Sequence, residues 1–312
     1  MKPTPTMVQI IEIGHDGDGQ RVDNYLIKKL KGVPKSHIYR IIRKGEVRVN
    51  KKRVKPETKL QLGDALRIPP VRVAQTNEIP RAGAGLLKYL GTSILFNGDD
   101  FMVVNKPQNL AVHRGSGQKI GLIDALRQLF PDESALELVH RLDKGTSGCI
   151  IISKNSIALR SLQRELKERN MHKTYHALVH GHWPDEMREV NVALQKSAIG
   201  SGQRIVKVAS DGKSARTCFR VLKRYHGATL IEAKPYTGRT HQIRVHCQHV
   251  GHSILGDDKY TLTSNKEYKQ IKNLCLHAHS ISFHYGNRSQ AYSFEAPENE
   301  AMKYAVRYLK GV

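Results

Sequence analysis

The sequence lacks long hydrophobic runs and an apolar leader. No stretch reaches the roughly 18 consecutive apolar residues that a membrane-spanning helix needs. Residues 1–18 also lack the apolar segment, roughly 7–15 residues long, of a secretory signal peptide. Both absences predict a cytoplasmic protein without a membrane partner.

Cysteine is scarce as well. The four cysteines are widely separated in the sequence and form no CxxC pair. A chain of 312 residues without a secretory signal is expected to keep them as free thiols. They are Cys149, Cys218, Cys247 and Cys275.

Negative charge is the third shortage. The chain has 28 Asp and Glu against 51 Lys and Arg, a formal net charge of +23. Such an excess repels itself unless a polyanion neutralises it. Nucleic acid is therefore the leading partner, and an anionic membrane surface is the second candidate.

The positive charge is concentrated near the N-terminus. Residues 19–70 contain fifteen Lys and Arg against four Asp and Glu, which gives +11 and leaves +12 for the other 260 residues. A separate RNA-facing module is predicted for this segment.

Two helices and a small sheet are predicted within residues 19–70. Apolar residues from Val22 to Leu30 follow a helical period, Pro34 begins a second helix and Gly45 ends it. A hairpin around Asn50 and a last strand follow. This arrangement leaves basic side chains in solvent, and they are the predicted RNA contacts of the module: Arg40, Arg43, Lys44, Lys51, Lys52 and Arg53.

The segment from Arg21 to Asp64, RVDNYL…KSHIYRIIRKGEVRVNKKRVKP…GD, has a recognisable pattern. It resembles the alpha-L RNA-binding module of a small-subunit ribosomal protein (the S-four type) and of tyrosyl-tRNA synthetases. The resemblance implies that this module binds RNA.

The rest of the chain is predicted to form a second domain. Short strand-like segments are joined by tight turns such as Asn97-Gly98 and Asp211-Gly212, which favours mostly antiparallel pairing. An α+β protein is therefore expected. Its predicted parts are an N-terminal tail at 1–18, the RNA-binding domain at 19–70, a linker at 71–85 and a domain on a mixed, mostly antiparallel sheet at 86–312.

The segment His140 to Gly148, HRLDKGTSG, is the sharpest candidate for chemistry. Asp143 lies on a loop between two apolar stretches, with Arg141 and Lys144 beside it. Such a loop can hold a carboxylate at the mouth of a cleft while the cations meet a phosphate backbone. An Asp in an ordinary tight turn explains the same letters equally well.

Three further segments accompany this loop. They are VVNKPQNLAVH (103–113), KTYHALVHG (173–181) and GRTHQIRVH (238–246). Together with HRLDKGTSG they resemble the RluA family of pseudouridine synthases, and with the N-terminal module the likeness covers nearly all of residues 15–310. One departure is Tyr260-Thr261, where the family usually has Tyr-Gly.

The resemblance implies a role for each matching residue. Asp143 corresponds to the essential carboxylate, Tyr175 to the tyrosine that lies against the target base, and Arg244 to the basic residue that pairs with the Asp. Arg141 corresponds to the side chain that enters the base stack when the uridine leaves it. Lys106, Arg239 and His241 are further expected RNA contacts.

The implied substrate is large-subunit ribosomal RNA, acted on by a monomer. Isomerising uridine needs one carboxylate, and neither a redox agent nor a group donor, so no cofactor is expected. Arg244 is expected to keep Asp143 ionised, and stacking on Tyr175 could offset the cost of flipping the uridine out of its stack.

Three alternatives stay open. The histidines between His241 and His252 could form a metal site, although zinc-like spacings such as HExxH or CxxC are absent. The chain could also be an inactive RNA-binding or ribosome-assembly factor. An RNA-cleaving acid–base enzyme is a weaker third, because no His pair is placed for it.

Overall fold

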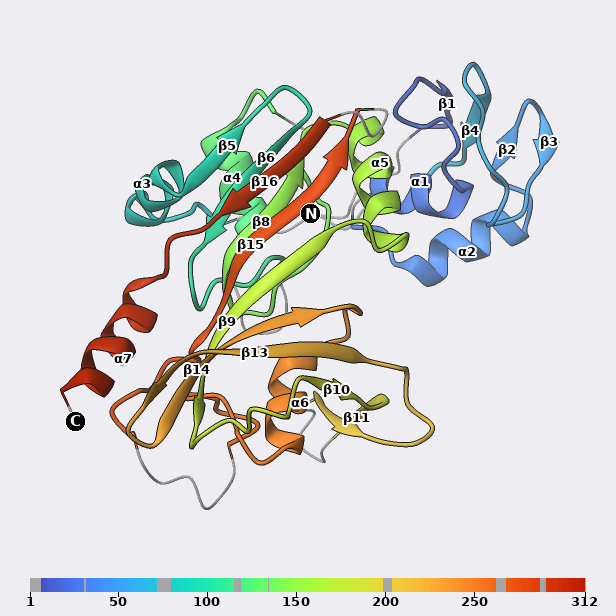
Figure 1. Cartoon of the computed structure of the whole chain (residues 1–312). Coiled ribbons are helices and arrows are strands. Elements are labelled where there is room, and N and C mark those ends of the chain that lie inside the picture. The colour runs from blue at the N-terminus through green and yellow to red at the C-terminus, as the bar shows by residue number, and fades with distance from the viewer. Residues whose placement is uncertain are drawn as a thin grey trace. The chain divides into compact units, whose positions relative to one another are not determined.

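The computed structural model divides the chain into two compact units, Met1–Ile79 (unit 1) and Pro80–Val312 (unit 2). Figure 1 shows unit 1 in blue and unit 2 from teal to red. The structure describes residues 7–30, 32–71, 80–114, 119–133, 135–198, 204–261, 268–286 and 290–311.

Unit 1 is a four-stranded antiparallel sheet with two helices, in the order β1-β4-β2-β3. Its elements are β1 (Gln9–Glu12), α1 (Val22–Lys29), α2 (Lys35–Arg43), β2 (Arg48–Val49), β3 (Lys52–Arg53) and β4 (Ala65–Ile68). Both predicted helices bury their apolar faces in one core, to which α1 contributes Leu26 and α2 contributes Ile38 and Ile42. The predicted helices and sheet of this module are confirmed.

Two turns of unit 1 contain residues with positive φ, at Gly45 and at Asn50 and Lys51. Gly45 has φ +71°, a left-handed conformation that favours glycine, and a Cβ there would lie 2.3 Å from Nε of Arg53, so the Arg53 side chain would have to shift for any other residue. Asn50 and Lys51 have φ of 49° and 65°, the left-handed pair that a two-residue hairpin requires. The end of α2 and the hairpin are thereby brought together.

The predicted boundaries of this module were too narrow. The expected tail at 1–18 contains β1, which pairs with β4, and Ile13, which is 1% exposed in the core. At the other end, Val71 is buried in the same core. Within the expected linker at 71–85, Ala82 already packs in the core of unit 2 and α3 begins at Ala84. Residues 1–6 and 72–79 lie outside the described part.

Unit 2 contains the remaining elements. Its helices are α3 (Ala84–Thr92), α4 (Leu122–Leu129), α5 (Ser156–Lys167), α6 (Gln242–His249) and α7 (Glu300–Lys310). Its strands are β5 (Ile94–Asn97), β6 (Phe101–Lys106), β7 (Glu137–Leu138), β8 (Ser147–Ser153), β9 (His172–His180), β10 (Glu189–Asn191), β11 (Leu194–Ala198), β12 (Arg204–Val208), β13 (Arg216–Tyr225), β14 (Ala228–Pro235), β15 (Leu276–Tyr285) and β16 (Gln290–Glu295).

One large sheet forms the frame of unit 2. Its main path runs β10-β13-β14-β9-β15-β8-β6-β5, with β16 beside β15 and β7 beside β8. Neighbouring strands pair antiparallel except β15 and β8, which are parallel. The prediction of a mixed, mostly antiparallel sheet is therefore confirmed.

The middle of this sheet is covered on both faces. All seven residues of β8 are buried, with Ile150 and Ile152 in one core cluster and Cys149 and Ile151 in another. Helices α3 and α4 contribute to the first cluster, and α5 contributes Leu162 to the second. Continuous apolar runs suit strands that are buried on both faces.

Two further expectations concern membranes and thiols. Within the described ranges, no helix is long and apolar enough to cross a membrane. All four cysteines are free thiols, and three of them are buried.

Candidate active site

The loop that carries Asp143 connects β7 to β8. The backbone N–H of Thr146 donates to the carbonyl of Asp143 at 3.1 Å and closes a turn. Gly148, two residues later, has φ +107°, and a Cβ there would lie 2.2 Å from the carbonyl oxygen of Ala278 on β15. Glycine thus allows β8 to pass close to β15 directly beside the loop.

Four strands bring the segments of the sequence motifs into one row. Lys106 on β6 is opposite Gly148 on β8, Gly148 is opposite Ala278 on β15, and Ala278 is opposite Tyr175 on β9. The loop of Asp143 begins beside this row. Residues more than one hundred positions apart in the sequence therefore meet at one place in the sheet.

Lys106 supports the Asp143 loop from inside the protein. Its side chain is fully buried, and Nζ donates to the carbonyls of Pro107 at 2.8 Å, Leu110 at 2.8 Å and Lys144 at 3.3 Å. Burial lowers the pKa of Lys106 to about 7, and the charge of Asp143 opposes this shift. The prediction that Lys106 contacts RNA was wrong, because the ammonium group does not reach the surface.

The start of β8 is fixed by a second set of hydrogen bonds. Ser147 Oγ lies 2.8 Å from Nδ1 of His277 and accepts from Nδ2 of Asn299 at 2.7 Å. His277 Nε2 lies 3.0 Å from the carbonyl of Ala296, so Nε2 carries the proton and Nδ1 accepts from Ser147. The Asp143 loop is therefore held at Lys144 and at the start of β8, both on the C-terminal side of Asp143.

Asp143 lies between two cavities. Its side chain is 20% exposed and lines both, one of about 770 Å³ and one of about 780 Å³. The first cavity (cavity 1) is bordered by Tyr175, by the end of α5 and by the loop from β14 to α6. Cavity 1 is large enough for a nucleotide and its neighbours.

Tyr175 lines cavity 1 together with Asp143. It is 9% exposed, and burial raises its pKa, with the charge of Asp143 adding to the shift. The phenol is therefore protonated at neutral pH. The structure brings these two predicted residues together.

Arg244 is placed differently from the prediction. Its Nε and Nη2 donate to both oxygens of Asp257 at 2.8 and 2.6 Å, and Nη2 also lies 3.2 Å from Asp258. Burial would lower the pKa of Arg244, but these carboxylates and the charge of Asp143 raise it instead. Among the described residues, its direct ion pairs are with Asp257 and Asp258, so the expected pair with Asp143 was wrong. In the described part of the chain, Arg244 and Asp143 are linked by a charge interaction rather than by a direct ion pair.

The imidazole of His241, which can be protonated, lies beside Asp143. Its Nε2 lies 3.9 Å from Oδ2 of Asp143, and its Nδ1 lies 2.7 Å from the hydroxyl of Tyr260. That hydroxyl accepts from the N–H of Val206 at 2.9 Å, so its proton is free to go to Nδ1 and Nε2–H faces Asp143. Burial lowers the pKa of His241, against the charge of Asp143.

Tyr260 and Asp257 were missed by the sequence analysis as site residues. Tyr260 is 2% exposed, and its ring lies 5.0 Å from the guanidinium of Arg244. Thr261, at the departure from the family pattern, donates through its hydroxyl to the carbonyl of Asp257. The departure therefore lies in the loop that holds Arg244.

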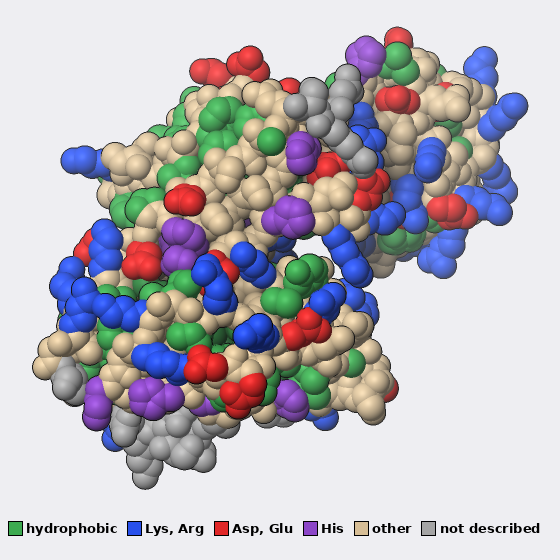
Figure 2. Space-filling view, in the orientation of Figure 1, with side chains coloured by type: hydrophobic (Ala, Val, Ile, Leu, Met, Phe, Trp, Pro, Cys, Tyr) green, Lys and Arg blue, Asp and Glu red, His purple; other side chains and the backbone are tan. Residues whose placement is uncertain are grey.

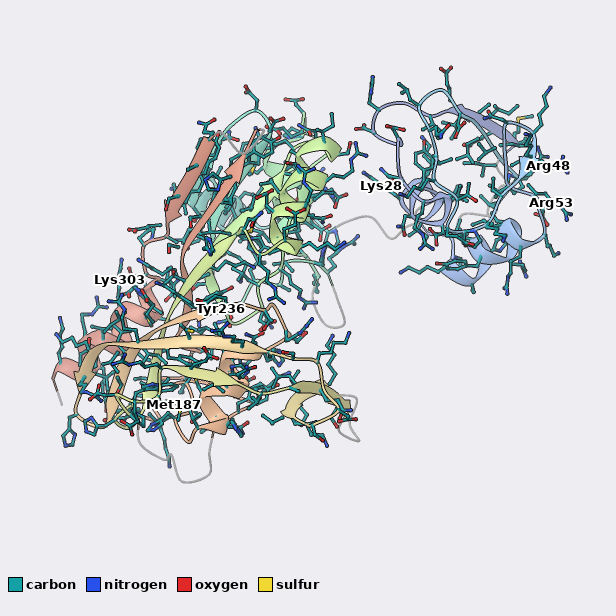
Figure 3. The ribbon with its side chains drawn as sticks, turned by 45° about the vertical axis from the view of Figure 1, so that its right-hand side comes forward. Lys28, Arg48, Arg53, Met187, Tyr236 and Lys303 are labelled. Carbon is teal, nitrogen blue, oxygen red and sulfur yellow. The ribbon has the colours of Figure 1, made fainter. Side chains whose placement is uncertain are left out.

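The other predicted RNA contacts are exposed. Arg141 and Arg239 line cavity 1, and Nε of Arg239 donates to the carbonyl of Ser214 at 3.1 Å. In unit 1 all six predicted residues are exposed: Arg40, Arg43, Lys44, Lys51, Lys52 and Arg53. Arg53 also donates to the carbonyl of Lys44 at 3.3 Å, and Figure 3 shows it near Arg48 on the same hairpin.

The histidines in and near α6 have different environments. His246 is fully buried in α6, and His252 Nδ1 lies 2.8 Å from the carbonyl of His180. Within the described residues, no group of three His, Cys, Asp or Glu is placed to hold a metal ion.

Comparison with known proteins identifies the family. Residues 20–66 match the S4 domain and residues 100–249 match the RNA pseudouridylate synthase family. The ribosomal large subunit pseudouridine synthase C of Haemophilus influenzae is 47% identical over 310 residues, 97% of this chain and 95% of that protein. The protein of the same name from Escherichia coli K12 is 46% identical over 320 residues and 99% of both chains.

A solved structure agrees. Human RNA pseudouridylate synthase domain containing 1 is 27% identical, with a TM-score of 0.58 over 75% of this chain and 98% of that chain. The matched family segment contains Asp143, Tyr175 and Arg244. The chain therefore belongs to the RluA family of RNA pseudouridine synthases, with an S4 domain in unit 1.

Proposed function

We propose that this chain isomerises selected uridines of large-subunit ribosomal RNA to pseudouridine, with Asp143 as the catalytic carboxylate. One observation carries the assignment of Asp143. It is the one acidic side chain among the described residues that line cavity 1. Seven cationic side chains share that lining: Arg141, Lys167, Arg169, Lys173, Lys234, Arg239 and Arg244.

This charge pattern suits an RNA substrate with a single reacting group. The cations can neutralise phosphates around the entering strand, while Asp143 remains the acceptor for chemistry. The charge of Asp143 acts to raise the pKa of both Lys106 and Arg244, which favours the cationic forms of these two side chains near the reacting carboxyl group.

The reaction moves the base without adding atoms. The bond from C1′ of the ribose to N1 of uracil breaks, the base turns, and a bond to C5 forms as the C5 proton leaves and N1 gains one. A carboxylate promotes the cleavage either as a nucleophile or by taking a ribose proton. Both routes need Asp143 beside a flipped-out nucleotide, and neither consumes a cofactor.

Tyr175 is the proposed partner of the flipped base. Its ring borders cavity 1, and its protonated phenol stays neutral beside Asp143. Stacking of a base on an aromatic ring contributes about 1–3 kcal/mol, similar to the few kcal/mol that flipping costs.

The proposal extends to the whole chain. Unit 1 holds the RNA through its exposed cations, and unit 2 performs the reaction. The names of the two relatives, ribosomal large subunit pseudouridine synthase C, support a target in the large ribosomal subunit. The protein is proposed to act as a cytoplasmic monomer.

The test is the Asp143→Asn variant on ribosomal RNA from a strain that lacks the enzyme. Carbodiimide treatment with primer extension should detect new pseudouridine with the natural protein and none with the variant, whose RNA affinity stays within about threefold. The matched control is Asp185→Asn, an exposed aspartate that pairs with Arg224 and lines neither cavity. If the variant kept more than about a thousandth of the natural turnover rate, Asp143 would lower the activation barrier by less than about 4 kcal/mol, and this result would contradict its role as the catalytic carboxylate.

The same assay distinguishes the proposed enzyme from an inactive RNA-binding factor. A natural protein that binds the RNA but produces no pseudouridine would support that alternative. Shortened RNA would instead indicate cleavage.

A further inference from the structure

Tyr236 presents an exposed aromatic ring at the border of cavity 1. It follows the last residue of β14, lines the cavity together with Asp143, and is 48% exposed. Figure 3 shows it on the side of β13 and β14 that faces the other strands of unit 2. The proposed chemistry at Asp143 does not use this ring.

The backbone of Tyr236 is held in place from two sides. Its N–H donates to the carbonyl of Arg216 on β13 at 2.9 Å, and the N–H of Arg216 donates to Oγ1 of Thr237 at 3.0 Å. Gln242, at the start of α6, donates to the same carbonyl at 3.0 Å and accepts from the N–H of Arg239 at 3.0 Å. The loop from Tyr236 to His241 is therefore anchored to β13 and to the start of α6.

One face of the ring is already covered. The guanidinium of Arg216 lies 4.6 Å from the ring centroid, and a hydrogen bond of 2.8 Å to Glu189 fixes that guanidinium. A cation on one face orients the ring and leaves the other face for a second flat group. An aromatic ring presented in this way is a stacking platform.

The surroundings favour a nucleotide as the flat group. Lys234 and Arg239 border the cavity on either side of Tyr236 in the sequence, and Figure 2 shows further Lys and Arg side chains over this part of unit 2. A basic groove with an exposed aromatic ring is the usual arrangement of single-strand binding sites.

We propose that Tyr236 stacks on a base next to the flipped uridine, and that the substrate is consequently an unpaired RNA segment. This proposal rests on the proposed function, because it takes the nucleotide at Asp143 as the reference point. A base within a duplex is stacked on both faces, whereas bases of loops and bulges are free to leave the stack. Tyr236 would thus select uridines whose neighbour is also unpaired.

The first test compares Tyr236→Ala and Tyr236→Phe on ribosomal RNA. Loss of one stacked base should raise KM between about fivefold and about 150-fold for the Ala variant, with kcat at saturating RNA within threefold. The Phe variant keeps the ring and should stay within threefold of the natural protein. The matched control is Tyr89→Ala on α3, where the tyrosine is 47% exposed. An unchanged KM in Tyr236→Ala, or an equal loss in Tyr236→Phe, would overturn the proposal.

The second test does not depend on catalysis. Trp183 is the chain's one tryptophan and is 1% exposed, so Tyr236→Trp adds one accessible fluorophore. A single-stranded uridine-rich oligonucleotide should quench the added emission as it binds, and Tyr89→Trp should show no such quenching. Saturated binding by anisotropy without quenching at position 236 would refute stacking. A quenched variant of a chain that forms no pseudouridine would instead uphold stacking and refute only the proposed function.

Discussion

Replacing His246 by Leu should remove a part of the pH dependence of the free energy of unfolding. His246 lies on α6, the helix that carries Arg244. His246 is fully buried, and neither ring nitrogen has a hydrogen-bond partner among the residues that the structure describes. Burial, with the charge of His249 adding to it, lowers the pKa of His246 from 6.5 to about 4. The ring is therefore neutral in the folded protein at pH 5, where it is protonated in the unfolded chain.

The sign follows from proton binding in the two states. Between pH 6.5 and 4 the unfolded chain binds more protons at His246, so the free energy of unfolding falls as the pH falls through this window. A shift from 6.5 to about 4 corresponds to about 3 kcal/mol over the whole window and to about 2 kcal/mol between pH 7 and pH 5. His246→Leu should lose this contribution.

The assay is urea unfolding of the natural protein and the variant at pH 7, 6 and 5. The variant should gain about 2 kcal/mol relative to the natural protein between pH 7 and pH 5. The exposed His226 provides the control His226→Leu, which should follow the natural protein. A constant difference between His246→Leu and the natural protein at all three pH values would refute the reasoning.

Two further predictions concern the loop of Asp143 and the RNA surface of unit 1. Lys106→Met should lower kcat by roughly 100-fold, because the Asp143 loop loses its buried support, while RNA affinity stays within threefold. Single-turnover kinetics and RNA titration measure the two quantities. Weaker RNA binding with unchanged kcat would show instead that Lys106 contacts RNA. Joint replacement of Arg43, Lys44 and Arg53 by Gln should reduce the slope of log affinity against log salt by roughly two to three, one counterion or slightly less for each lost phosphate contact. The control Lys303→Gln, on α7, should keep the slope, and an equal change in both proteins would remove the assignment of unit 1 as an RNA-binding surface.

The sequence predicted unit 1 well because its elements are amphipathic. Its helices bury one apolar face each, and its hairpin has a turn sequence that requires left-handed residues. A period of 3.6 residues and a local turn are both visible in a single sequence. The outer strand β1 was missed because its four residues expose most of their surface and show no alternation.

Helix α6 shows why periodicity fails in the catalytic unit. The six residues from Gln242 to Cys247 are all buried, including Arg244 and His246. A helix that is buried all round has no apolar stripe, so the segment was noted only for its charged residues. The partner of Arg244 was missed for a related reason. Asp257 lies on a loop 13 residues away, and no sequence pattern connects the two.

The row across four strands explains why the motifs of the sequence belong to one site. Antiparallel pairing places the end of β6 beside the start of β8, and the parallel step to β15 brings Tyr175 of β9 to the same level. Each motif therefore marks the point where its strand crosses this row. The buried Lys106 and the glycine at 148 serve the close approach of strands and loops, whereas Asp143 reaches the cavity from the row's edge. Residue types alone could not distinguish these roles, because the sequence does not show whether a lysine supports a loop or binds phosphate. The two roles differ in the burial of the side chain, and the position of the residue in the sheet determines that burial.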